Sequence, residues 1–425
     1  MPDPSHATPG APSRSVLTDT RLRALLAVCL FTYVAQNMLN VSVAPLSRSL
    51  GLHEWVVGLA VSSAALTVTV LSQFWGRRSV AWGLRRVLIT ALSLAVGAGC
   101  LFALAVALRA HGLLGTGLTA ALIVVARGPL FGGAVAAIPP AGQALIAQIT
   151  PDQASRVRGM SAFSGSVQLA IVLGSLASSA LGAWSIYAPV HATPVAVVLA
   201  LAIGWLWLPR EEGGAAGGGR ERVPALPPRV SWHDRRVSPW VGSAFGLFFT
   251  SGMVQITAGF LVQDRLGLAP HRALGMTAVM LLANAAGATL TQLLLVPRLG
   301  WAPERLVRIG STTALVALGA LWAAPGLWLM AASTLLIGVG AGLLGPGFTA
   351  GGSLSVSAAE QGGIAGLLQA TAASTWILAP VTATALYAWQ PAAPFALSGA
   401  VLASSTAVAW IRLGPARHSP SRPGL

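Results

Sequence analysis

Long runs of apolar residues dominate the chain and define its predicted elements. A helix needs about 20 residues to cross the hydrocarbon core of a bilayer, and twelve runs reach that length. Barrel strands would be about half as long and would alternate polar with apolar positions, so these runs predict helices. The predicted spans are 22–46, 55–75, 87–108, 118–147, 160–183, 189–208, 239–262, 272–296, 305–324, 327–348, 362–388 and 391–413.

One long polar stretch interrupts this pattern. Residues 209–238 combine glycine, proline and mixed charges, which is typical of a flexible linker. They separate six spans from six, so we predict an all-α integral membrane protein with six-helix bundles at 21–208 and 239–413. Residues 1–20 are predicted to be a disordered tail and not a signal peptide, and 414–425 a second tail.

Composition and charge agree with this pattern. Only 9% of residues are charged and 55% are hydrophobic, whereas soluble domains are about one quarter charged. All 26 basic residues are arginine. With the N-terminus inside, 21 of them fall in inner segments, four in outer loops and one, Arg127, within a span. This bias predicts that both termini are cytoplasmic. Basic residues spread over many short loops argue against nucleic-acid binding, despite a net charge of +15.

Short segments recur in the same order in both halves. The paired loops are 76–89 with 297–309, and 152–159 with 360–366. Two six-helix repeats in parallel orientation resemble the major facilitator superfamily of transporters, and the resemblance covers about 20–413. It implies two bundles that rock about a central substrate site in the cell membrane, plasma or inner.

The family's most specific motif lies between the second and third helices and is degenerate here. The usual pattern is Gly-x-x-x-Asp-Arg-x-Gly-Arg-Arg/Lys. This chain has Gly76, Gly83, Arg85 and Arg86, with Val80 at the Asp position. In the family that Asp helps to lock the cytoplasmic side, and Val80 puts such a lock in doubt. Topology explains the arginines, whereas close turns favour glycine. All four residues are candidates for coupling or gating.

The loop at 152–159 is also similar to the family's loop between the fourth and fifth helices. Asp152 and Arg156 could form a cytoplasmic ion pair there. An exposed pair contributes only about 0–1 kcal/mol, so its role in gating is a hypothesis. Glu360 lies in the matching loop of the second half and is a further candidate.

The fourth span resembles that of the drug:proton antiporter families, in which an arginine precedes a glycine-rich stretch. Here the stretch runs from Arg127 to Gly133, and the spacing from Arg127 to the later glycine differs by one residue from the usual pattern. The fifth helix of such exporters often contains Gly-Pro, but 174–182 lacks the proline. The resemblance implies an exporter of drugs or natural products.

Arg127 is the sharpest chemical feature. An arginine at the centre of a span costs some 2.5–3.5 kcal/mol on insertion scales and usually faces a bundle interior or a water-filled cavity. The alternative is that its side chain snorkels to the membrane surface. We expect Arg127 to bind an anionic or polar substrate group, or to influence a proton site.

Neutral polar residues also occur within the spans. Tyr33, Asn37 (or Gln36) and Asn40 share one face of the first helix. The alternative for each is hydrogen bonding between helices. Together they predict a polar binding site between the halves, with Trp376 facing a cavity. The candidates are Tyr33, Gln36, Asn37, Asn40, Gln168, Gln255, Asn284, Gln369 and Trp376.

Acidic residues are informative by their positions. No Asp, Glu or His lies at the middle of a span, although proton-coupled transporters usually carry one there. Three explanations remain open. Coupling uses an acid at a span's edge, such as Glu54, Asp264 or Glu360; it depends on Arg127 and a charged substrate; or the protein is an uncoupled facilitator.

The first hypothesis is an exporter of a small, largely apolar organic compound, with protons as a candidate exchange partner. The second is an importer or facilitator of a neutral or anionic metabolite. The third is a non-transporting membrane sensor. The sequence shows no catalytic triad, phosphate loop or metal-ligand cluster, so we expect no enzyme activity, cofactor or metal. The expected partners are a small-molecule substrate and the lipid bilayer, and we expect a functional monomer.

Overall fold

The structure is a computed structural model that describes most of the chain. Several predicted features lie outside the described residues: most of the two tails, the middle of the linker, and Glu54. The described residues are 18–52, 55–209, 228–267 and 270–413.

The described residues form helices joined by turns, and twelve helices are long and apolar enough to cross a membrane. This confirms the predicted fold class. The N-terminal half contains α1 (Thr20–Ser49), α2 (Trp55–Trp82), α3 (Leu84–Ala110), α4 (Thr116–Val125), η2 (Ala126–Phe131), α5 (Gly132–Val135), α6 (Ile138–Ile149), α7 (Gln153–Trp184) and α8 (Ala188–Trp207). The C-terminal half contains α9 (Ser238–Leu266), α10 (Pro270–Leu290), η3 (Thr291–Leu295), α11 (Val296–Leu299), α12 (Pro303–Ala323), α13 (Leu327–Leu354), η4 (Ala358–Glu360), α14 (Gln361–Trp389) and α15 (Ala393–Arg412).

The predicted inner loop 76–89 is wrong at every residue except Gly83, because α2 continues as far as Trp82 and α3 begins at Leu84. Aromatic rings accommodate the charge of this extra turn, since Cζ of Arg78 lies 4.4 Å from the ring centroid of Trp82. The chain turns at Gly83, whose φ of 87° and ψ of 151° suit glycine alone. Gly83 is therefore the turn residue of the motif, and Gly76 lies within a helix.

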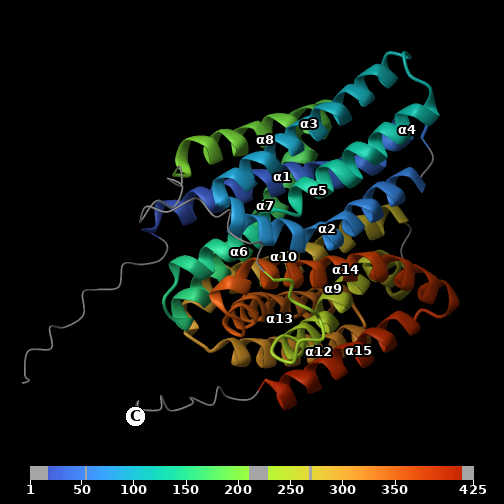
Figure 1. The fold of residues 1–425 in the computed structure, drawn as a ribbon. Helices are drawn as coiled ribbons and strands as arrows, with labels where there is room; N and C mark the ends of the chain where they lie inside the picture. Colours follow the sequence, from blue (N-terminus) through green and yellow to red (C-terminus); the bar gives the residue numbers. More distant parts are fainter. Residues whose placement is uncertain (1–17, 53–54, 210–227, 268–269, 414–425) are drawn as a thin grey trace, which may run out of the picture.

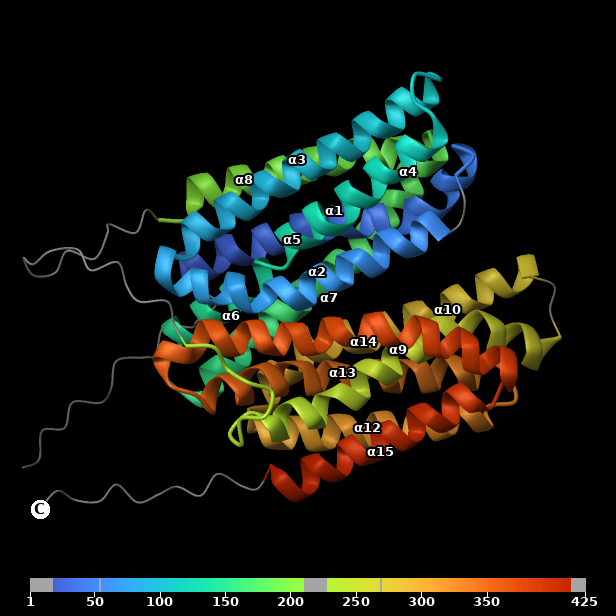
Figure 2. The same cartoon turned by 45° about the vertical axis from the view of Figure 1, so that its right-hand side comes forward.

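The two halves lie side by side, with α1–α8 in the upper part and α9–α15 in the lower part of Figures 1 and 2. We call the end at which α1 begins, α8 ends, α9 begins and α15 ends the linker end. Across the halves, α2 packs on α14, and α7 packs on α10 and α13. The helices diverge from the linker end toward the far end (Figure 2).

Small residues hold the halves together at the linker end. A Cβ atom on Gly76 of α2 would overlap the carbonyl oxygen of Gly362 in α14. One turn away, a Cβ on Gly366 would lie 2.6 Å from the backbone nitrogen of Gln73. Backbones that approach this closely need glycine on the facing surface. The hydroxyl of Ser161 in α7 also donates to the backbone carbonyl of Gln292 in η3.

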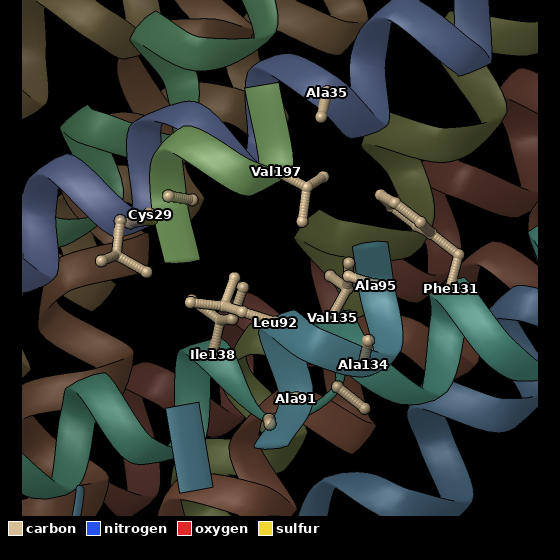
Figure 3. Packing of buried hydrophobic residues seen from close by; sticks show 14 of the residues in the cluster. Cys29, Ala35, Ala91, Leu92, Ala95, Phe131, Ala134, Val135, Ile138 and Val197 are labelled. Atoms are coloured by element: carbon tan, nitrogen blue, oxygen red, sulfur yellow. The ribbon is translucent and has the colours of Figure 1, made fainter. Parts of the chain in front are cut away.

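A tightly packed apolar cluster fills the N-terminal half. Cys29 of α1, Leu92 of α3, Phe131 of η2, Ile138 of α6 and Val197 of α8 are all at most 1% exposed, and Figure 3 shows them together. Cys29 acts here as a small apolar residue, as its sequence context predicts. The cluster fixes η2, and hence Arg127, against its neighbouring helices.

Candidate functional site

The helix that carries Arg127 contains a π turn. Residues Ala126–Phe131 form it and include Pro129, which has no N–H to donate to the helical ladder. A π turn holds more residues than an α turn, so Gly132 lies at a different position around the helix relative to Arg127 than it would in a regular α-helix. A Cβ on Gly132 would lie 2.9 Å from Cα of Ala64, and one on Gly128 would lie 3.0 Å from Cβ of Ser63. These glycines therefore press the π turn against α2.

Arg127 is only 3% exposed, so its side chain does not snorkel to the surface. Its Nη2 donates a hydrogen bond to Oδ1 of Asn40 in α1. Cζ lies 5.6 Å from the ring centroid of Phe131. Nε and Nη1 are buried and have no hydrogen-bond partner among the described residues. The guanidinium group thus reaches α1 with much of its donor capacity unused.

The polar face of α1 continues this cluster. Nδ2 of Asn40 donates to Oδ1 of Asn37 at 3.5 Å, and Asn40 is an exposed residue. Gln36 and Asn37 are half-buried, and Oε1 of Gln36 and Nδ2 of Asn37 have no partner among the described atoms. Tyr33 is half-buried against the N-terminal core. The structure therefore brings Arg127, Asn40 and Asn37 into one hydrogen-bonded chain.

The other candidates of the polar set are not hydrogen-bonded to Arg127, Asn40 or Asn37 in the described structure. Asn284 of α10 donates through Nδ2 to the carbonyl of Thr334 in α13 at 3.0 Å. This is a hydrogen bond between helices, the alternative to substrate binding that the sequence offers for these residues. The remaining four candidates make no hydrogen bond to Arg127 or Asn40 in the described part of the protein. Gln255 and Trp376 are exposed, and Gln168 and Gln369 are half-buried.

At the motif between α2 and α3, the residues lie in different surroundings. Nη2 of Arg85 donates to the backbone carbonyl of Trp205 in α8 at 2.9 Å, and Arg86 is exposed. A Cβ on Gly362 would lie 2.9 Å from Cγ2 of Val80. The position at which the family has Asp therefore makes an apolar contact between the halves.

The ion pair considered for Asp152 and Arg156 does not form in the described structure. Asp152 caps α7 by accepting a hydrogen bond from the backbone nitrogen of Ser155 at 2.8 Å. This bond is the main cause of a lowered pKa for the Asp152 carboxyl. Arg156 instead donates to the carbonyl of Ala147 at 2.8 Å and, across the halves, to the hydroxyl of Ser353 at 3.5 Å. The first turn of a helix has backbone N–H groups without helical acceptors, and Asp152 satisfies one of them.

Sequence reasoning missed a second connection between the halves. Residues 228–237, which we call the strap, run from the linker to the start of α9. Nε2 of Gln73 in α2 donates to the carbonyl of Val230 at 2.8 Å. Nε1 of Trp232 donates to the hydroxyl of Thr371 in α14 at 3.2 Å. The strap thus bonds to both helices of the closest contact between the halves.

Charged groups fasten the strap. Nη2 of Arg236 lies 2.8 Å from a carboxylate oxygen of Asp234 and 2.8 Å from one of Glu360 in η4. Hydrogen bonds from Arg236 hold the pKa of the Asp234 carboxyl below its usual value. Glu360, a gating candidate from the sequence, is therefore paired with an arginine 124 positions away.

Toward the far end, one acid is paired with a phenol. The hydroxyl of Tyr387 in α14 donates to Oδ2 of Asp264 in α9 at 2.5 Å. Asp264 is an exposed residue near the end of its span. Of the acids considered for coupling, it is the one that the structure describes without an arginine partner.

Several solved structures share this fold. The human organic anion transporter MFSD10 (TETRAN) superposes with a TM-score of 0.73 at 14% identity, over 94% of this chain and 100% of that one. A bacterial homologue of the iron transporter ferroportin, in an outward-facing state, gives 0.72 at 15% identity, over 92% and 99%. The transporter FucP in the outward conformation gives 0.67 at 14% identity, over 95% and 100%.

Sequence comparison gives the family. No curated protein matches the chain, but the family model of the Major Facilitator Superfamily matches residues 25–380. Twelve membrane-length helices and the fold shared with known transporters agree with that match. Transporters of this family bind small molecules and lie in membranes, so the structure is that of a membrane transporter and not of an enzyme. The chain belongs to the Major Facilitator Superfamily.

Proposed function

We propose that the protein exports a small, largely apolar organic compound across the cell membrane by alternating access, as a monomer. The observation that carries this proposal is the π turn at Arg127. It absorbs a one-residue difference in spacing, and so supports the resemblance of the fourth span to drug:proton antiporters. The predominantly apolar composition of the spans, with few polar groups, suits a moderately hydrophobic ligand.

The conformation of the two halves supports alternating access. Their glycine contacts, Gly76 with Gly362 and Gly366 with Gln73, lie at the linker end, and the helices diverge toward the far end (Figure 2). The bias of arginines toward inner segments supports a cytoplasmic linker end. With that orientation the structure is outward-facing, the state named for the ferroportin homologue and FucP structures.

For exchange with protons, Asp264 is the coupling candidate. Glu360 is held as a carboxylate by Arg236 at the linker end, whereas Asp264 bonds to a neutral phenol. The alternative function is an uncoupled facilitator or importer, and the lack of an acid in the interior of any span favours it.

Transport in inverted vesicles tests these functions. The probes are naphthalene-1-sulfonate, naphthalene-1-sulfonamide and 1-naphthylmethylammonium, which share an apolar body and differ in charge. Uptake that requires an acidic interior supports proton-driven export, and uptake that is independent of the gradient supports the facilitator. Asp264→Asn should remove only the dependence on the gradient. If none of the three probes enters faster than into empty vesicles, transport of this compound class is refuted.

A further inference from the structure

Arg127 poses a problem of charge balance. It is 97% buried inside a membrane-spanning segment, and within the described residues no carboxylate forms an ion pair with it. The interiors of the spans contain no Asp or Glu from which a partner could come. Burying a charge without a counter-charge is costly even when some hydrogen bonds are made. A bound anion would supply the counter-charge that no described residue supplies.

The hydrogen-bond donors of Arg127 are unused as well. A guanidinium group carries five N–H donors in a planar fork that matches two oxygens of a carboxylate or sulfonate. Here Asn40 takes one contact, and Nε and Nη1 have none among the described atoms. Water could accept these hydrogens but would leave the charge uncompensated. An oxyanion supplies the acceptors and the charge together.

Asn40 marks the side from which such a group would enter. Its Oδ1 occupies the position of an anionic oxygen on Nη2 of Arg127, while the residue itself is exposed. Asn40 is therefore accessible from outside the protein, whereas Arg127 behind it is buried. Rotation of its side chain frees Nη2 of Arg127. Nδ2 of Asn37, which has no partner in the described structure, lies on the same helix face as a further donor.

We infer that the substrate of this site is an organic monoanion, with a carboxylate or sulfonate group that replaces Oδ1 of Asn40 on Arg127. The inference rests on the proposed transport function and names the substrate class. The apolar body of the ligand lies between the halves. Asn40 acts as a neutral placeholder that satisfies Arg127 in part while the site is empty.

Binding to the purified protein in nanodiscs tests this without transport. We expect radiolabelled naphthalene-1-sulfonate to bind about tenfold or more tightly than naphthalene-1-sulfonamide, since charged hydrogen bonds exceed neutral ones by roughly that factor. Arg127→Gln should remove this preference, whereas Arg127→Lys should keep part of it. Arg308→Gln is the matched control. Arg308 lies in the C-terminal half, away from Arg127 in sequence, and is a half-buried arginine that bonds to carbonyl groups of that same half. This substitution should leave the preference unchanged.

Asn40→Asp keeps the inference testable if Arg127→Gln does not fold. The new carboxylate would pair with Arg127 and occupy the site from within, so sulfonate binding should fall about tenfold or more while sulfonamide binding stays. Equal binding of both probes, or a preference that survives Arg127→Gln or Asn40→Asp, would overturn the inference. Displacement of the probe by inorganic sulfate at equal affinity would also overturn it, because the site would then hold a simple anion.

The binding and transport results are separable. A sulfonate preference without uptake of any probe refutes the proposed function and supports an anion site. Uptake of the sulfonamide without a preference for the sulfonate supports transport and refutes the inference that the substrate is an organic monoanion.

Discussion

Substitution of Gly76 by alanine should open the linker end. The added methyl group would overlap the carbonyl oxygen of Gly362 and lie 3.1 Å from Cβ of Pro140. Neither neighbour is the tip of a flexible side chain, so α2 and α14 must separate. The overlap exists only while the two helices are in contact, and the substitution therefore penalises the closed linker end relative to the open one.

Overpacking by a methyl group typically costs about 1–3 kcal/mol. Applied to one of two conformations, that cost shifts their ratio by roughly 5–150-fold. Alanine also favours any helix over glycine by about 1 kcal/mol, and this effect needs a control. Gly97→Ala provides it, because a Cβ on Gly97, inside α3, meets nothing within 4 Å.

Spin labels can measure the opening directly. Arg158 and Arg298 are exposed residues at the linker end of opposite halves, and cysteines there, in a background without Cys100, report the distance between the halves. Gly76→Ala should add a population with a longer distance, and Gly97→Ala should not. An unchanged distance distribution in a folded Gly76→Ala protein would show that this contact does not control the closed state.

Three further predictions concern the linker end. Arg236→Gln should release the strap and increase hydrogen exchange in 228–237, whereas the exposed neighbour Arg235→Gln should not; equal exchange in both would contradict the role of the charged cluster. Asp234 has a lowered pKa, so its bond to Arg236 stabilises the strap above its ordinary pKa of 3.8 and is lost as the pH falls through the lowered value. Labels at the two ends of the strap should therefore report a loosened strap only below about pH 4, and loosening near neutral pH would contradict this. Gly83→Ala should destabilise the protein by about 1–3 kcal/mol because of the positive φ, as thermal unfolding can measure; an unchanged midpoint would refute it.

The membrane-spanning architecture was predictable because apolar runs of this length have few alternatives in structure. The turn at Gly83 was predictable for the same kind of local reason, since its backbone conformation suits glycine alone. The role of Gly76 was not, because it depends on α14, which is distant in sequence. From the sequence, Gly76 resembled a turn residue; in the structure it is a contact between helices.

The site was predictable in part. Arg127 and Asn40 stood out as polar residues in apolar spans, but their hydrogen bond joins positions 87 apart. The one-residue change of spacing after Arg127, together with Pro129, was a signal of the π turn. The strap gave no signal, since its composition is that of a flexible linker and its partner Gln73 lies 157 positions from Val230.

Under the proposed function, the uncompensated charge of Arg127 would also make transport sensitive to voltage. A charge that moves through the whole membrane field changes energy by about 2.3 kcal/mol for every 100 mV. If the cargo is the monoanion inferred above, the loaded site would be neutral, and the loaded protein would change conformation with little dependence on the membrane potential. The empty protein would retain the positive charge. The potential would then act on the return step, and it would set the direction of net flux even where no proton is carried.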